Sequence, residues 1–296
     1  MRVFHCDGYA VPLPEGHRFP MRKYRLLRER LLSEGVLAAA ELADSEPIDP
    51  AALRLVHTGA YVDALLDGTL TQADERRLGF PWSEALVLRS RASTWGTVAA
   101  ARSALEEGVA GNLAGGTHHA FADHGEGFCV FNDIAVAIRL LQREGRIERA
   151  AVVDLDVHQG NGTAAIFEGD PRVFTFSMHG AKNFPFRKQR STLDVELPDG
   201  CGDTEYLETL RRHLLRVLEG AELVFLQAGV DPLREDALGR LDLSLEGLRQ
   251  RDRAVLEAAR GLHLPIVMTL GGGYAKPIEL SVEAHVGTYR EAKRIY

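Results

Sequence analysis

The sequence predicts an α/β fold built around a central, mostly parallel β-sheet, and two observations support this. Short apolar segments alternate with longer amphipathic segments along all 296 residues, which is typical of repeated strand–helix units. The best of these segments is a continuous run rich in valine, as expected for a strand buried on both faces. We find no internal repeat, low-complexity tract or linker, so residues 1–296 are expected to form a single domain.

The first half of the chain is expected to contain two strands and two principal helices. Residues 1–5 read as a short strand, and a segment from His17 leads into an amphipathic helix that ends near Gly35. Residues 38–50 are expected to form a helix fragment and a loop. A long alanine-rich helix is predicted from the Pro81–Glu84 segment to about Glu107, because Ser83 is a suitable N-cap. A short strand then covers residues 109–114.

The second half repeats the strand–helix order. A glycine-bearing loop over residues 125–133 precedes a helix over 134–144, whose basic end suits the helix dipole. Strands are predicted in the stretch Ala150–Gly162, whose first half is apolar, and over 173–178, 223–231 and 265–274, and residues 180–202 are expected to form a loop. The remaining helices are predicted over 203–219, 244–261 and 278–292.

Composition limits the classes of partner. With 35 basic and 42 acidic residues, the formal net charge is -7, which argues against nucleic acid as the main partner but not against a cationic substrate such as a basic protein segment. No apolar run approaches the roughly 20 residues of a membrane span, and the first residues lack a signal-peptide core. Cys6, Cys129 and Cys201 are far apart and form no CxxC pair, so free thiols and a cytoplasmic location are expected.

The stretch Ala150–Gly162 carries the strongest chemical signal. After the apolar run, Asp154, Asp156 and His158 follow at every second position, which would place their side chains on one side of a strand end. Buried carboxylates are costly unless they are paired or bind metal. Asp-x-His supplies two ligands for a cation such as zinc. The alternative is a polar strand end that caps the next helix.

Three further polar clusters follow apolar strands. His118 and His119 come after two glycines, and histidine is the usual general acid or base near neutral pH. Asp231 could be a third metal ligand, which would complete a site with an open position, or it could lie in a simple Asp-Pro turn. Tyr274 follows Gly271–Gly273 and could donate to an oxyanion, or it could be an aromatic residue at the rim. The carboxyl ends of parallel strands meet at one crevice, which could collect all four clusters.

At these motifs the sequence resembles the metal-dependent histone deacetylase family, and most closely its class IV branch. The resemblance rests on GGTHH (115–119), GEGFCVFND (125–133), DLDVHQGNG (154–162), AGVDPLREDALG (228–239) and GGGY (271–274), in that order. It implies the three-layer α/β/α arginase-deacetylase fold. It also implies an amide hydrolase that removes acetyl or longer acyl groups from lysine side chains of proteins.

The resemblance further implies a role for each matching residue. Asp156, His158 and Asp231 would bind Zn²⁺, although Fe²⁺ or Co²⁺ would also suit these ligands. Asp154 would hydrogen-bond His118, Asn161 would be the neutral partner of His119, and Tyr274 would stabilise the transition state. The acyl-lysine channel would be walled by Gly127, Phe128 and either Phe184 or Phe186. A structural K⁺ would be held by Asp154 and the main-chain carbonyls of Asp156, His158, Ser177 and Met178.

Other functions remain open at this point. An acetylpolyamine or other small-amide hydrolase could use the same site, although we see no inserted segment that would narrow its channel. A binuclear manganese ureohydrolase is disfavoured because Asp231-Pro-Leu lacks a second bridging Asp. A non-enzymatic module that binds acylated ligands would be expected to have lost a ligand or Tyr274, and neither is missing. Oligomeric state and preferred acyl length do not follow from the sequence.

Overall fold

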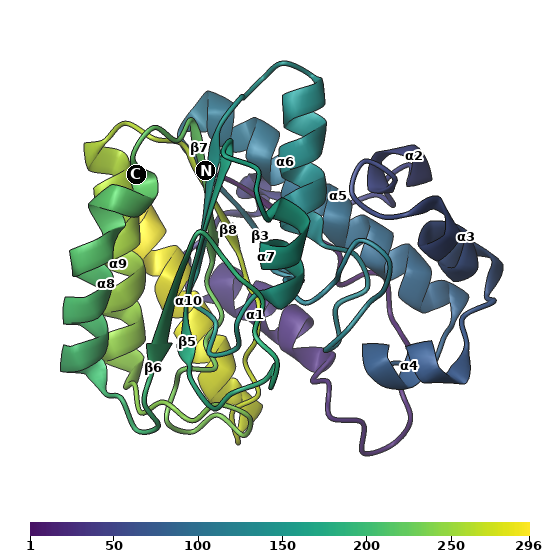
Figure 1. The fold of residues 1–296 in the computed structure, drawn as a ribbon. Coiled ribbons are helices and arrows are strands. Elements are labelled where there is room, and N and C mark those ends of the chain that lie inside the picture. The colour runs from purple at the N-terminus through teal and green to yellow at the C-terminus, as the bar shows by residue number, and fades with distance from the viewer.

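The computed structural model describes residues 1–296, and its centre is one eight-stranded sheet in which every neighbouring pair of strands is parallel (Figure 1). The strand order is β2-β1-β3-β8-β7-β4-β5-β6. The prediction of an α/β fold with a mostly parallel sheet is therefore confirmed. The strands are β1 (Arg2–His5), β2 (Leu42–Asp44), β3 (Val109–Asn112), β4 (Ala150–Asp154), β5 (Val173–Gly180), β6 (Leu193–Leu197), β7 (Leu223–Gln227) and β8 (Ile266–Thr269).

Helices cover both faces of the sheet, which gives the three-layer α/β/α arrangement. One layer contains α1 (Arg22–Ser33), α8 (Asp203–Leu218), α9 (Leu245–Gly261) and α10 (Ile278–Ile295), and its buried residues form one apolar core with the sheet. The other contains α2 (Pro50–Leu53), α3 (Gly59–Asp67), α4 (Gln72–Leu78), α5 (Glu84–Glu107), α6 (Asp133–Arg143) and α7 (Asn161–Phe167), around a second core. A 3₁₀ turn spans Ala39–Glu41. None of the helices combines the length and the hydrophobicity needed to cross a bilayer.

The central strand β4 shows why its sequence is continuously apolar. Ala151 and Val153 pack into the core on one face, whereas Ala150 and Val152 pack into the core on the other. Because successive side chains point to opposite faces, a strand between two helical layers needs apolar residues at every position. Local capping residues fix the flanking helices: Ser83 accepts a hydrogen bond from the backbone N–H of Leu86 at the start of α5, as expected.

The structure differs from the sequence prediction mainly at the edges of the sheet. The expected loop 180–202 contains β6, and the expected helix fragment and loop 38–50 contains β2. Both are edge strands, which pair on one side only and remain partly exposed, so their mixed polar sequences resemble loops. The helices α2, α3, α4 and α7 were not predicted. Strands β7 and β8 end earlier than predicted, at Gln227 and Thr269, and the motifs that follow them are loops.

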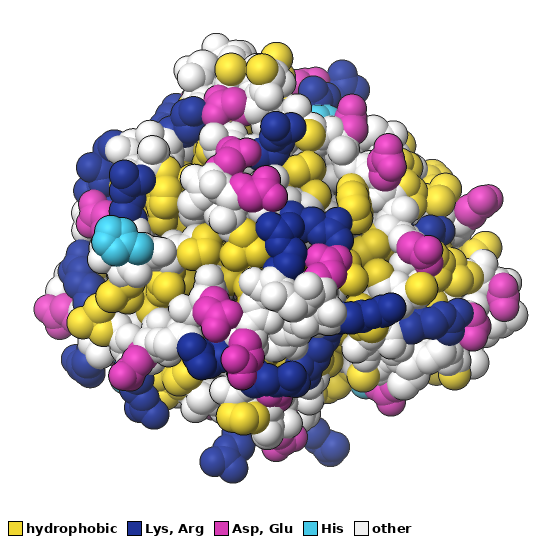
Figure 2. Space-filling view, turned by 90° about the horizontal axis from the view of Figure 1, so that it is seen from above, with side chains coloured by type: hydrophobic (Ala, Val, Ile, Leu, Met, Phe, Trp, Pro, Cys, Tyr) yellow, Lys and Arg dark blue, Asp and Glu magenta, His cyan; other side chains and the backbone are white.

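The four predicted clusters follow the four central strands. Strands β3, β8, β7 and β4 are adjacent in the sheet, and their carboxyl ends lie at the edge marked by the β6 arrowhead at the bottom of Figure 1. The opposite face, at the amino ends of the strands, is seen from above in Figure 2 and carries basic, acidic and hydrophobic side chains interspersed. The polar loops are therefore gathered at one edge of the molecule.

Candidate active site

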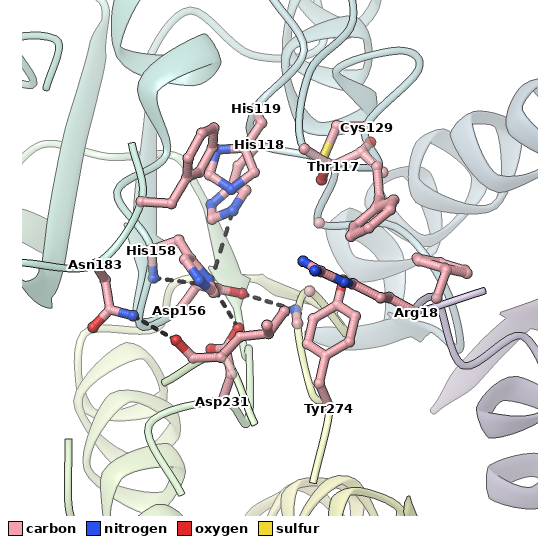
Figure 3. Close-up of a pocket in the computed structure, with 18 of the residues that line it drawn as sticks. Arg18, Thr117, His118, His119, Cys129, Asp156, His158, Asn183, Asp231 and Tyr274 are labelled. Carbon is pink, nitrogen blue, oxygen red and sulfur yellow. Dashed lines mark hydrogen bonds and ion pairs between the residues drawn. The ribbon is translucent and has the colours of Figure 1, made fainter. Parts of the chain in front are cut away.

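The loops after the four central strands line one cavity of about 450 Å³. His118 and His119 come from the loop after β3, Asp156 and His158 from the loop after β4, Asp231 from the loop after β7, and Tyr274 from the loop after β8. Figure 3 shows the labelled side chains converging from these loops. Segments that are far apart in the sequence are thus brought to one pocket by the parallel strand order.

Asp156, His158 and Asp231 form a compact group at the base of the cavity. One ligand atom from each lies within 4.8 Å of the others. The His158 Nδ1 atom is 3.0 Å from Asp156 Oδ1 and 3.1 Å from Asp231 Oδ2. The Asp231 and Asp156 residues are 0% and 1% exposed. Two carboxylates and an imidazole therefore converge where water cannot screen them.

The electrostatics of this group fit a bound cation. Burial raises the pKa of Asp231, and the nearby Asp156 carboxylate raises it further, because two buried anions repel each other. Burial opposes protonation of His158, yet its contacts with Asp156 and Asp231 raise its pKa to about 10. The proton on His158 thus takes the place of a positive charge that the two carboxylates require. Carboxylate and imidazole ligands with an open position suit a divalent transition metal such as zinc.

His118 is paired with a buried carboxylate. Its Nδ1 lies 2.6 Å from Asp154 Oδ2. Although burial lowers the pKa of His118, the charges of Asp154 and Asp156 raise it to about 9. Strand β4 ends at Asp154, so the regular alternation expected through His158 does not continue. Asp154 accordingly lies outside the compact Asp156–His158–Asp231 group and contacts His118 instead.

His119 has a neutral partner whose orientation is fixed by a third residue. The His119 Nδ1 atom is 2.6 Å from Asn161 Oδ1, and the Asn161 Nδ2 group donates to Glu126 Oε2 at 2.9 Å. Because the amide nitrogen faces Glu126, the amide oxygen faces His119 and must accept a hydrogen bond from its Nδ1–H. The Nε2 atom of neutral His119 then carries a lone pair. Burial and the neighbouring His118 and His158 hold the pKa of His119 well below 6.5.

Asp133 holds the loop that carries the two histidines. Its carboxylate accepts hydrogen bonds from the backbone N–H groups of Gly116 and Thr117, at 3.0 and 2.8 Å. Gly116 has a φ of 72°, and a Cβ there would lie 2.6 Å from the backbone nitrogen of Gly271. This close approach of the loops after β3 and β8 requires glycine.

Tyr274 projects into the cavity with its hydroxyl free (Figure 3). Its backbone N–H donates to Asp236 Oδ2 at 2.6 Å, whereas its hydroxyl makes no hydrogen bond. Burial raises the pKa of Tyr274 well above 10, so the hydroxyl keeps its proton. A Cβ on the neighbouring Gly272 would collide with the Asp231 carboxylate, which explains the absence of a side chain in this turn. The backbone of Tyr274 is therefore fixed by Asp236, and its protonated hydroxyl can donate a hydrogen bond into the cavity.

The expected channel residues all line the cavity, but they differ in depth. The Phe184 ring lies 5.0 Å from the His119 ring, and the Phe128 ring lies 6.2 Å from the Tyr274 ring. Gly127 has a φ of 55°, and a Cβ there would lie 2.7 Å from the His119 ring. Phe186 is 90% exposed and belongs to the outer rim. The inner walls are thus formed by Phe128 and Phe184.

The residues expected around potassium lie beside the same strand end. Asp154 on β4 is the register partner of Ser177 on β5, and Met178 follows Ser177. The backbone carbonyls of Asp156 and His158 accept no hydrogen bond, although both residues are buried. Carboxylate and main-chain carbonyl oxygens are ligand types that a monovalent cation accepts.

Several residues at the site were not predicted. Gln227, at the end of β7, donates from Nε2 to Asp156 Oδ2 at 3.0 Å. Buried Lys23, on α1, donates to the carbonyls of Gly271 and Gly273. Arg18 precedes α1 and points into the cavity beside Tyr274 (Figure 3). A buried lysine on an amphipathic helix has no sequence signal, whereas Gln227 could have been suspected as a polar residue ending an apolar strand.

Comparison with known proteins shows which family the chain belongs to. The model of the histone deacetylase domain matches residues 17–289. An uncharacterised protein of Picosynechococcus is 48% identical over 296 residues, which cover 99% of this chain and 98% of that protein. Histone deacetylase 2 of Arabidopsis thaliana is 36% identical over 253 residues, which cover 80% of this chain and 64% of that protein. The crystal structure of a histone deacetylase homologue from Aquifex aeolicus matches with a TM-score of 0.84 at 26% identity, covering 100% of this chain and 84% of that one. The chain belongs to the histone deacetylase family of hydrolases.

Proposed function

We propose that the protein is a zinc-dependent deacylase that hydrolyses the amide bond between an acyl group and an amine, such as the side chain of an acylated lysine. One observation carries this proposal: Asp156, His158 and Asp231 lie at the base of a cavity whose walls also present two differently paired histidines and a free tyrosine hydroxyl. Phe128 and Phe184 would flank the linear chain of the substrate and exclude water.

Asp156, His158 and Asp231 would hold the ion, and K⁺ would lie near Asp154 and Ser177. The divalent ion would polarise the amide carbonyl and lower the pKa of a water molecule. Fe²⁺ or Co²⁺ could serve in place of Zn²⁺, because all three accept these ligands.

His119 would act as the general base. Its Nδ1–H is directed at Asn161, so Nε2 is the atom that can accept a proton from water. The oxygen of that water then bonds to the carbonyl carbon. His118, with its higher pKa, would remain a cation beside Asp154 and favour the developing negative charge.

Tyr274 would donate its hydroxyl to the oxyanion as the carbonyl oxygen becomes charged. The proton held on His119 then passes to the leaving nitrogen, and the C–N bond breaks. The products are a carboxylate and an amine. His118 and His119 would be held for these steps by their hydrogen bonds to Asp154 and Asn161, and Tyr274 by the hydrogen bond from its backbone N–H to Asp236.

The proposal is tested by metal-defined enzyme with an acetyl-lysine substrate, with and without chelator. We expect hydrolysis that chelation abolishes and Zn²⁺ restores. Asp231→Ala should lose both activity and most of the bound metal, because it removes one of three ligands. Cys129→Ala is a matched control, since Cys129 lines the same cavity but contacts no member of the metal group. Full metal occupancy in Asp231→Ala would contradict the ligand assignment.

A further inference from the structure

Arg18 is an unpaired cation at the cavity. Its side chain is exposed, lines the cavity, and makes neither a hydrogen bond nor an ion pair. Figure 3 shows it pointing inward beside Tyr274. Arginine side chains at a protein surface usually meet a carboxylate or open solvent, so an arginine aimed into a pocket without a partner is available to a ligand.

The backbone on both sides of Arg18 is anchored. The backbone N–H of Phe19 donates to His17 Nδ1 at 3.1 Å, so His17 Nε2 carries the proton and donates to the Gly79 carbonyl at 3.0 Å. The Phe19 ring packs 5.5 Å from the Phe128 ring of the channel wall. The backbone that carries Arg18 is therefore held beside the cavity before a ligand arrives.

Two more cations line the cavity, Lys182 and Arg240. Both are exposed, and they share a single carboxylate: Asp199 lies 3.5 Å from Lys182 and 3.4 Å from Arg240. The three basic residues thus retain an excess of positive charge. Among the residues that line the cavity, the only acids are Asp156 and Asp231, at its base.

This local excess contrasts with the net charge of the chain and with the face at the amino ends of the strands. The chain carries a net charge of -7, and basic and acidic side chains are interspersed on the face shown in Figure 2. A cationic opening on an acidic protein would attract anions and repel cations on approach. It disfavours polyamines and strongly basic protein segments as substrates.

We propose that the preferred substrate is an acylated amine that carries an anionic group, a carboxylate or a phosphate, on its amine side. The inference rests on the proposed deacylase function. Arg18 would hold that group through its planar guanidinium, which can donate two parallel hydrogen bonds to a carboxylate or phosphate. Lys182 and Arg240 would add unspecific attraction. The anion could belong to a small acylated amino acid or to an acidic peptide around an acyl-lysine.

The test compares matched substrates that differ only in charge. One arm measures kcat/KM for 6-acetamidohexanoate against 6-acetamidohexanamide. A second arm uses seven-residue peptides with a central acetyl-lysine flanked by either glutamate or glutamine. We expect kcat/KM to be roughly tenfold higher for the anionic member of at least one pair. This factor corresponds to the low end of the free energy contributed by a charged hydrogen bond, because Arg18 is exposed to solvent. Preference in the first arm alone identifies a small acid, and preference in the second an acidic segment.

Variants assign the preference to Arg18. Arg18→Gln should reduce the ratio towards one by lowering kcat/KM for the anion alone, and Arg18→Lys should retain part of it. Arg22→Gln is the matched control, because Arg22 is exposed, pairs with Glu279 outside the cavity, and should leave the ratio unchanged. Added salt should weaken the preference. Hydrolysis of both members at equal rates would overturn this inference while leaving the deacylase function intact. Failure of the metal-loaded enzyme on every acylated amine would overturn both.

Discussion

Replacing Asn161 by aspartate should convert His119 from a weak base into a stronger one and move the acid limb of the kcat/KM profile to higher pH. The structure contains an internal reference for this change. His118 Nδ1 and His119 Nδ1 each lie 2.6 Å from their partners, but the partner of His118 is a carboxylate and that of His119 is an amide. The pKa of His118 is raised to about 9, whereas that of His119 is lowered well below 6.5.

The structure also shows why the single substitution is a poor experiment. The Asn161 amide donates to Glu126, so an aspartate at this position would lose that donor and face a second carboxylate. The two acids would repel each other, and one would tend to keep a proton. In the double variant Asn161→Asp with Glu126→Gln, the amide at position 126 can donate a hydrogen bond to the carboxylate at position 161, which reverses the direction of the wild-type hydrogen bond. The double variant therefore isolates the new charge beside His119.

The expected magnitude follows from one opposite charge at contact distance. Such a charge raises a histidine pKa by roughly 1 to 3. A general base must be unprotonated, so raising its pKa reduces activity on the acid side: the pH at which kcat/KM falls to half of its plateau should move upward by roughly 1 to 3 pH units relative to the wild type. The assay is the kcat/KM profile from pH 5 to 9.5. Glu126→Gln alone is the control and should leave the limb where it is. An acid limb that does not move in the double variant would refute the assignment of His119 as the base.

Three further outcomes are expected. Tyr274→Phe should lower kcat and kcat/KM together by roughly 10²-fold, and a change confined to KM would instead make it a wall residue. His119→Ala should nearly abolish hydrolysis while His118→Ala leaves measurable turnover, and equal losses would contradict unequal roles. Burial lowers the pKa of His57 to about 4, and its Nε2 accepts from the Asn132 N–H. Between pH 6.5 and 4, the unfolded chain therefore binds a proton on His57 that the native state does not. The free energy of unfolding should decrease as the pH is lowered through this window, by about 2 kcal/mol at pH 5 relative to pH 8. Urea unfolding should show a loss that is about 2 kcal/mol larger in the wild type than in His57→Gln, because only the His57 contribution is removed; identical pH dependence in both would contradict it.

The core of the fold was predictable because its signals are local. Each central strand is a short apolar run ended by a polar motif, and parallel pairing brings those ends together whatever the sequence between them. The edge strands were not predictable in this way. Strand β6 has the sequence Leu-Asp-Val-Glu-Leu, whose alternation suits a half-exposed strand, but its five residues become a strand only by pairing with β5. The structure of the edge strands is therefore decided by their place beside a neighbouring strand and not by their own sequence.

The unpredicted site residues are those whose role depends on distant contacts. Asp236 belongs to the motif AGVDPLREDALG (228–239). Its contact with the Tyr274 backbone joins the loops after β7 and β8, and the spacing of residues within the motif does not predict this contact. Arg18 lies about 100 residues from the histidine pair in an irregular segment, where an arginine is most often solvated. Only the cavity reveals that it points inward.

The two histidines show where sequence and structure each contribute. The family resemblance supplies the chemical types of their partners, an acid at Asp154 and an amide at Asn161, and thereby predicts unequal basicity. It cannot supply the direction of the hydrogen bond, because an amide can either donate or accept. Glu126 decides that direction by taking the amide N–H, which leaves the oxygen for His119 and the Nε2 lone pair for the cavity. The inequality of the histidines therefore depends on three residues, Asp154, Asn161 and Glu126, and the contact between Asn161 and Glu126 is visible only in the structure.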